Sequence, residues 1–185
     1  WAGVNIKNES QGNEKDSTSI QYHVIQKLKE QNFDIIFDDD NAGEIADVIA
    51  IEVDDVNKKV KVELFHLKFS QEDRPGARIN DLYAVNGQAQ KCVSWLHTRP
   101  EHIIGRMLRR GASGPKNRYE LGTEEQLSII REKVKSLYEI EYIVHIVQPG
   151  LSKAAASREQ LKLLSLTEAF LWETRMIKLG VIASA

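Results

Sequence analysis

Apolar positions near the start of the chain predict one helix followed by three strands. Over residues 17–31 they recur with the spacing of one helix face, and Ser17 or Ser19 is placed to cap that helix. The next apolar stretches are shorter and rich in valine and isoleucine, which favours strand over helix. The three expected strands cover residues 33–37, 44–53 and 60–69.

The second and third strands can be placed in register as a hairpin. If residues 55–58 form the loop and Asp54 pairs with Lys59, then Glu52 faces Lys61 in a cross-strand ion pair. Both faces of the hairpin are then largely apolar, as in a central hairpin covered on two sides. The exceptions lie at the end away from the loop, where this register brings together Asp47, His66 and Lys68.

The rest of the chain predicts alternating helices and strands. Pro100 and a capping box of Thr123 with Gln126 indicate that residues 99–139 form a helical insertion. Residues 1–15 are polar and lack periodicity, so an irregular tail is expected there. The other expected elements are a helix from Asp81 to about residue 97, a buried strand over 138–148 ending at Pro149, a helix over 157–174 and an edge strand over 179–184.

Composition indicates one globular domain. With 185 residues, 42% hydrophobic and 28% charged, the chain can bury one good core, so residues 16–185 are expected to form one domain. No apolar run approaches the roughly 20 residues of a membrane-spanning helix. The single Cys92 excludes a disulfide framework and suits a reducing cytoplasm. A start at Trp1 rather than Met suggests a module that acts with other domains or subunits of a larger protein.

The order helix, strand, hairpin and helix, with two short motifs, resembles the PD-(D/E)XK nucleases. "EIAD" supplies Asp47 at the start of the second strand, and "HLK" supplies His66 and Lys68 on the third. His66 stands where the family usually has Glu or Asp. The resemblance spans roughly residues 17–97 and a later strand, and it implies the restriction-endonuclease-like α/β fold, a mixed central sheet flanked by helices.

The resemblance also implies metal-dependent hydrolysis of phosphodiester bonds in DNA, by an endonuclease of defence or DNA processing. Asp47, a ring nitrogen of His66 and the carbonyl of Leu67 would bind Mg²⁺ or Mn²⁺, which activates water and neutralises phosphate charge. Imidazole shifts the preference towards Mn²⁺. Lys68 would stabilise charge on the scissile phosphate. Because a ligand histidine must be neutral, activity is expected to fall as pH drops through the imidazole range near 6.5.

Other polar residues are candidates for accessory roles. Gln21 stands where related nucleases often carry a helical Glu, and Gln88 resembles a Gln that some members place near the scissile phosphate. Glu44 could ligate a second ion, and Glu63 would enter the site only if a bulge flipped its strand. The acidic run 38–40 looks like a metal-binding cluster, but a charge run in a turn is usually solvated, so a solvated turn is expected.

One segment stands out by its charge. Residues 99–118 contain six basic residues and one acidic residue, a local charge of +5 in a chain whose net charge is −2. They are expected to contact DNA phosphates, although a solvated basic helix end has the same pattern. Arg74 and Arg78 follow Lys68 and are expected to position the DNA strand. The basic residues of the segment are Arg99, Arg106, Arg109, Arg110, Lys116 and Arg118.

Two other interpretations remain open at this point. His66 and Gln21 replace residues that the family usually has as carboxylates, so the chain could be a catalytically inactive copy of the fold that binds DNA or protein. The basic segment could also belong to an unrelated α/β interaction domain.

Overall fold

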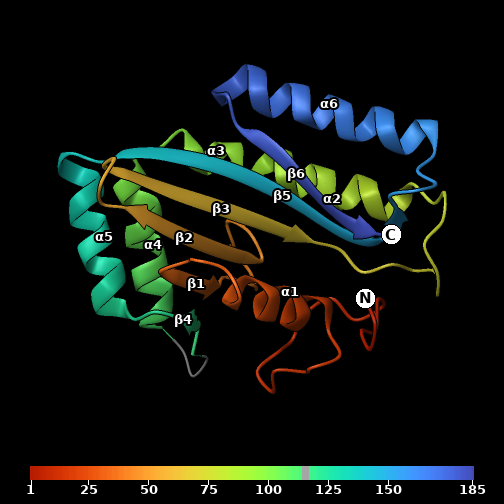
Figure 1. Cartoon of the computed structure of the whole chain (residues 1–185), viewed down its shortest axis with the longest axis horizontal. Helices are drawn as coiled ribbons and strands as arrows, with labels where there is room; N and C mark the ends of the chain where they lie inside the picture. Colours follow the sequence, from red (N-terminus) through yellow and green to blue (C-terminus); the bar gives the residue numbers. More distant parts are fainter. Residues whose placement is uncertain (114–116) are drawn as a thin grey trace.

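A six-stranded mixed sheet forms the centre of the computed structural model, which describes residues 1–113 and 117–185 (Figure 1). The strand order is β4-β1-β2-β3-β5-β6; β4, β1, β2 and β3 pair antiparallel, whereas β5 runs parallel to β3 and β6 parallel to β5. The strands are β1 (Ile35–Asp38), β2 (Val48–Asp54), β3 (Lys59–Leu67), β4 (Tyr119–Leu121), β5 (Glu139–Ser152) and β6 (Lys178–Ser184).

Helices flank both faces of this sheet and confirm the predicted α/β class. Helix α1 (Ile20–Lys29) packs on one face, in a cluster with apolar residues of β1, β2 and β3. The other helices contribute to a larger cluster on the opposite face. They are α2 (Asn80–Lys91), α3 (Val93–Leu96), α4 (Pro100–Gly111), α5 (Glu124–Ser136) and α6 (Arg158–Arg175).

The β2–β3 hairpin has the register predicted from the sequence. Asp54 pairs with Lys59, and Glu52 pairs with Lys61, whose ammonium forms an ion pair with the Glu52 carboxylate. The ladder continues to Val48 without a bulge, so each residue keeps the face assigned to it by the period of two.

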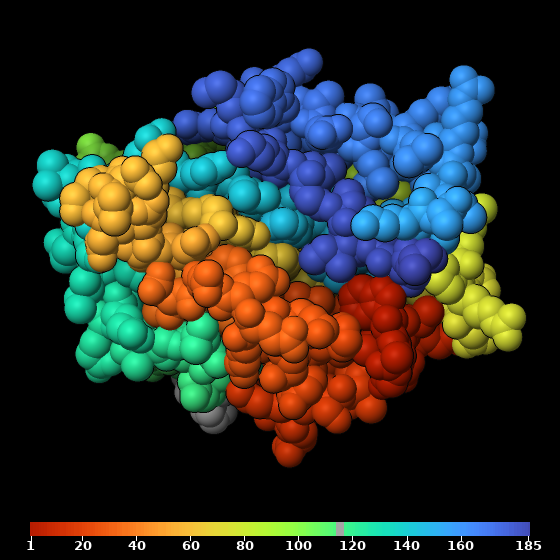
Figure 2. Space-filling model, viewed as in Figure 1, coloured from red at the N-terminus to blue at the C-terminus, as the bar shows by residue number. Residues whose placement is uncertain are grey.

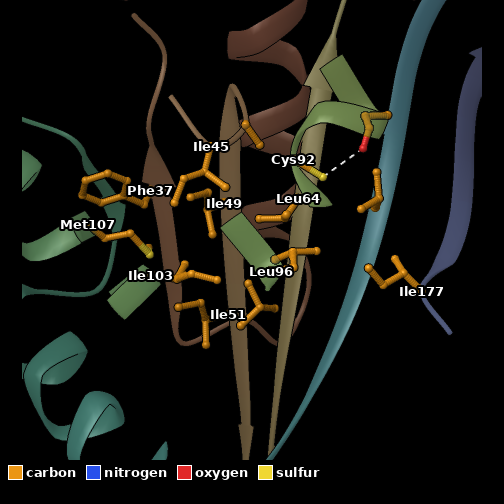
Figure 3. Packing of buried hydrophobic residues seen from close by; sticks show 14 of the residues in the cluster. Phe37, Ile45, Ile49, Ile51, Leu64, Cys92, Leu96, Ile103, Met107 and Ile177 are labelled. Atoms are coloured by element: carbon orange, nitrogen blue, oxygen red, sulfur yellow. Dashed lines mark hydrogen bonds between the residues drawn. The ribbon is translucent and has the colours of Figure 1, made fainter. Parts of the chain in front are cut away.

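Burial on both faces explains why this hairpin is so apolar. Ala50 and Phe65 lie in the cluster with α1. Ile49, Ile51 and Leu64, which alternate with them along the strands, belong to the opposite cluster and are fully buried. Figure 3 shows this larger cluster, in which strand residues Phe37, Ile49, Ile51 and Leu64 pack with helix residues Leu96, Ile103 and Met107.

The later elements follow the prediction with three main differences. The single helix expected from Asp81 to about residue 97 is divided at Cys92 into α2 and α3. The strand expected to end at Pro149 continues to Ser152, and Pro149 is tolerated because the pairing of β5 with β6 is irregular between Gln148 and Ser152. The predicted helical insertion contains α4 and α5 but also the short strand β4, which extends the sheet beside β1. Thr123 and Ser157 cap α5 and α6.

Residues 1–15 form no helix or strand, yet they are held against the start of α1 and the end of β3. Backbone hydrogen bonds join Asn5 to Thr18, Ile20 to Asn8 and Ser70 to Ile6, with N···O distances of 2.7–2.9 Å. The space-filling view shows this segment in red, packed into the body of the molecule (Figure 2). Among the described residues, no helix is both long and apolar enough to cross a lipid bilayer.

Candidate active site

Asp47 lies just before β2 and is the best anchored residue of the candidate site. Its carboxylate Oδ2 accepts a hydrogen bond of 2.8 Å from the backbone N–H of Leu67, at the end of β3. The side chain is buried, with 4% of the residue exposed. The hairpin register therefore brings the "EIAD" and "HLK" motifs together at one end of the sheet.

Two further carboxylates lie beside Asp47. Oxygen atoms of Asp40, Glu44 and Asp47 lie within 4.8 Å of one another, and we call these three residues the carboxylate cluster. Glu44 was a candidate from the sequence, whereas Asp40 was not, because it belongs to the acidic run expected to be a solvated turn. In the part of the chain that the structure describes, His66 does not join this cluster.

The cluster carries more negative charge than its surroundings neutralise. Burial, chiefly, raises the pKa of Asp47 well above its usual value, and the nearby charges of Glu44, Glu9 and Asp40 raise it further. Burial likewise raises the pKa of Glu44, and the charges of Asp40 and Asp39 add to this effect. The hydrogen bond from Leu67 opposes the shift at Asp47 without cancelling it.

This donor set fits a hard divalent cation. The charges of Asp40 and Glu44 both raise the pKa of Asp47, and a cation held between the carboxylates would remove that repulsion. Oxygen ligands are those that Mg²⁺ and Mn²⁺ accept in proteins. The residues best placed to hold such an ion are therefore Asp40, Glu44 and Asp47. Of the predicted set of Asp47, His66 and the Leu67 carbonyl, Asp47 belongs to this cluster, and the ligand roles of the other two stay predictions.

His66 faces a small cavity beside the cluster. The cavity measures about 110 Å³ and is lined by polar and apolar side chains, among them Glu44 and Gln88. The ring atom Nε2 of His66 and the side-chain oxygen of Gln88 are buried, and neither has a hydrogen-bond partner among the described residues. Burial lowers the pKa of His66 to about 3, so the imidazole is neutral at physiological pH. The acid limb near pH 6.5 expected from a titrating histidine therefore does not follow for His66.

Lys68 is paired with a residue that the sequence analysis did not single out. Its ammonium Nζ lies 2.8 Å from Glu9 Oε2, and the same oxygen accepts a hydrogen bond of 2.9 Å from the N–H of Phe69. The ammonium also lies 4.6 Å from the centre of the Phe69 ring. Glu9 sits in an irregular, polar segment, and no periodic pattern could have marked it.

Gln21 lies near the cluster, but its side chain is occupied by contacts within the protein. Its amide nitrogen donates to Asp38 at 3.1 Å and more weakly, at 3.4 Å, to the carbonyl of Asp47. Its amide oxygen accepts from the N–H of Gln11 at 2.9 Å. Gln21 thus joins α1, the N-terminal segment and the end of β1.

The interpretation of 38–40 as a solvated turn is wrong. Asp38 and Asp39 are both fully buried. Asp39 forms an ion pair with Arg110 and accepts a hydrogen bond from Ile45 N–H, and Asp38 accepts one from Gln11. The sequence could not reveal this, because Arg110 reaches Asp39 from 71 residues away in the chain.

Glu63 lies on the other face of the sheet from the cavity. It pairs with Ala50, which belongs to the α1 cluster, and its carboxylate contacts His145 at 2.6 Å and Lys61 at 3.1 Å. With no bulge in β3, the condition for its entry into the site is not met.

Half of the basic segment holds the acidic loop 38–44. Arg106 donates to the carbonyl of Gly43, Arg110 to those of Asp39 and Ala42, and Arg118 to those of Asp38 and Asp40. Arg109 is exposed, and Arg99, also exposed, lies 4.0 Å from Glu101. Lys116 lies outside the described residues.

The two arginines that follow Lys68 differ in their surroundings. Arg74 is exposed. Arg78 contacts Glu72 and Asp81, each at 3.5 Å. Of the two, Arg74 is the one whose side chain stands in solvent.

Comparisons with known proteins add no family assignment: no family model matches the chain, and neither a curated protein nor a solved structure shows significant similarity to it.

The cluster predicts a specific response to loss of one charge. Asp47→Asn keeps an oxygen for the Leu67 N–H but removes a ligand charge, so Mn²⁺ affinity measured by calorimetry should fall at least about tenfold, equivalent to about 1.4 kcal/mol. Because the folded-state pKa of Asp47 is raised, the stability it contributes is present at low pH and lost as pH rises through that pKa. At neutral pH the metal-free variant should therefore melt no lower than wild type. The exposed Asp73→Asn is the matched control. Unchanged Mn²⁺ affinity in Asp47→Asn would place the ion elsewhere.

The acidic loop predicts unequal roles for two neighbouring arginines. Arg110→Met leaves the buried Asp39 without its cation, so the free energy of unfolding in urea should fall by about 3–5 kcal/mol. Arg109→Met changes an exposed side chain on the same helix and should alter it by less than about 0.5 kcal/mol. Two equally small losses would contradict the structural role of Arg110.

Proposed function

We propose that this protein is a metal-dependent nuclease that hydrolyses phosphodiester bonds in DNA as an endonuclease. The observation that carries the proposal is the anchoring of Asp47 to Leu67 N–H, because it places a three-carboxylate cluster beside the strand end that bears Lys68. The α/β fold with its central hairpin is consistent with the restriction-endonuclease-like arrangement that the "EIAD" and "HLK" motifs resemble. Cytoplasmic action is also part of the proposal, because the one cysteine, Cys92, is buried and unpaired.

The residues of the site have separable roles in such a reaction. A divalent cation held by the carboxylate cluster would supply an activated water and neutralise charge on the phosphate. Asp47 would orient the cluster, because the hydrogen bond from Leu67 N–H fixes its carboxylate at the end of β3, next to Lys68 in the chain. The Lys68 ammonium would stabilise the negative charge that grows on the phosphate oxygens during in-line attack.

For DNA contact we propose the exposed arginines rather than the whole basic segment. Arg106, Arg110 and Arg118 are engaged with the acidic loop, so their charges are partly neutralised by carbonyls and by Asp39. Arg74 and Arg109 are exposed and free to meet phosphates, which bind cations without regard to sequence.

The second candidate function is that of an inactive nuclease fold which binds DNA or protein. The observation that favours it is the pairing of Lys68 with Glu9, since an ammonium already bound to a carboxylate stabilises the charge of a phosphate less well. The buried Nε2 of His66, which has no hydrogen-bond partner among the described residues, points the same way because it lies outside the carboxylate cluster. Cleavage assays separate the two functions.

The nuclease proposal predicts metal-dependent nicking of supercoiled plasmid. Wild type should nick DNA with Mn²⁺ or Mg²⁺ and stop when EDTA is added. Lys68→Ala should lower the cleavage rate by on the order of 10²-fold while most DNA affinity remains, because one ammonium is a small part of the binding surface. Lys153→Ala, at an exposed site, is the control. No cleavage by wild type with either metal would support the inactive fold instead, and full activity of Lys68→Ala would remove Lys68 from the reaction.

The role of His66 can be tested apart from its packing. His66→Leu removes a buried nitrogen that has no hydrogen-bond partner among the described residues, so the free energy of unfolding should not decrease. Cleavage should nevertheless fall, because the ring faces the cavity that Glu44 of the carboxylate cluster also lines. His66→Glu should retain cleavage with a preference shifted from Mn²⁺ towards Mg²⁺. Because the pKa of His66 is about 3, any step in the wild-type rate near pH 6.5 should persist in His66→Glu. Normal cleavage by His66→Leu would assign this residue to the core.

A further inference from the structure

The ion pair between Glu9 and Lys68 is largely buried and is fixed by an additional backbone hydrogen bond, unlike a typical surface ion pair. One carboxylate oxygen accepts from both the Lys68 ammonium, at 2.8 Å, and the Phe69 N–H, at 2.9 Å. The two side chains are only 24% and 21% exposed. Because Phe69 N–H is fixed by the backbone, Glu9 ties the flexible lysine to a rigid point at the end of β3.

The segment that carries Glu9 is itself held on both sides of that residue. The N–H of Gln21, in α1, donates to the Glu9 carbonyl at 3.0 Å, and Ile20 N–H donates to the Asn8 carbonyl at 2.9 Å. Two residues on, Gln11 donates to Asp38 at 2.8 Å and, from its backbone, to Gln21. The segment that carries Glu9 is therefore fixed by hydrogen bonds to helix α1 and to the end of β1, which holds Glu9 in place beside Lys68.

The ion pair with Glu9 also affects whether the Lys68 ammonium can compete with a cation for the carboxylate cluster. Lys68 directly follows Leu67, whose N–H donates to Asp47, so the lysine tied to Glu9 is next in the chain to the residue that anchors the cluster. An untethered ammonium beside three carboxylates would be drawn onto them and would compete with a cation for the same oxygens. The ion pair with Glu9 instead keeps the ammonium on the Glu9 carboxylate.

We propose that Glu9 is a positioning residue that holds the Lys68 ammonium beside the carboxylate cluster, so that residues 5–11 are an integral part of the active site. The inference rests on the proposed nuclease function for its catalytic meaning. Its structural half, the immobilisation of Lys68, can be measured without any activity.

The first measurement follows the chemical accessibility of Lys68. In Glu9→Gln, acetylation of Lys68 by an N-hydroxysuccinimide ester, followed by peptide mass spectrometry, should be faster than in wild type by roughly threefold or more, because the ammonium loses its charged partner. Lys153, which is exposed, is the internal reference in the same digest. Glu14→Gln, an exposed glutamate of the same segment, should leave the rate unchanged.

The second measurement follows cleavage. Glu9→Gln should lower kcat by about tenfold with little change in KM for DNA, and Glu9→Asp should recover part of the loss, since the carboxylate remains but is one methylene shorter. The melting temperature, recorded for each variant, shows that the segment stays folded. If Glu9 were only structural, Glu9→Gln would lower the melting temperature without a selective loss of kcat, and Glu9→Asp would not restore kcat.

The two measurements fail in different ways. Unchanged labelling of Lys68 in Glu9→Gln would overturn the inference, and so would increased labelling with an unchanged kcat. If wild type cleaves no DNA under any metal condition, the nuclease proposal fails and the catalytic role of Glu9 fails with it, while labelling still decides whether Glu9 immobilises Lys68.

Discussion

Burial of three aspartates at one end of the sheet is the constraint around which the neighbouring residues are arranged. Asp38 and Asp39 are fully buried and Asp47 nearly so, and an isolated buried carboxylate is strongly unfavourable. The protein offsets this with groups from distant parts of the chain. Arg110 reaches Asp39, Gln11 and Gln21 reach Asp38, and the Leu67 N–H reaches Asp47.

These contacts neutralise the acidic end unevenly. Asp39 has an arginine, whereas Asp47, Glu44 and Asp40 face one another with no cation of their own among the described residues, since Lys68 is paired with Glu9. The raised pKa of Asp47 is the physical mark of that imbalance. A structural site would favour neutral or paired groups there, so the imbalance itself supports a role in binding a cation.

The same arrangement changes how the basic segment is interpreted. A local charge of +5 is typical of a surface for nucleic acid, yet Arg106, Arg110 and Arg118 are occupied with the loop that carries the acidic residues. Their contacts are with this loop, so the proposal for DNA contact is left with the exposed arginines. Neighbouring residues of α4 thus have different surroundings, since Arg110 pairs with Asp39 and Arg109 is exposed.

Local patterns in the sequence determined the helices, the α/β class and the hairpin register, because periodicity and caps act over a few residues and both faces of β2 and β3 are buried. The register placed Asp47 beside the end of β3, opposite His66, and the structure shows that its carboxylate bonds to the N–H of Leu67 there. Only the tertiary structure decided the rest of the site. Asp40 joins Asp47, Glu9 meets Lys68, and Arg110 meets Asp39 through contacts between segments that are distant in the chain. A charged residue has no periodicity to reveal its partner, because ion pairs depend on where the folded segments meet and not on local spacing.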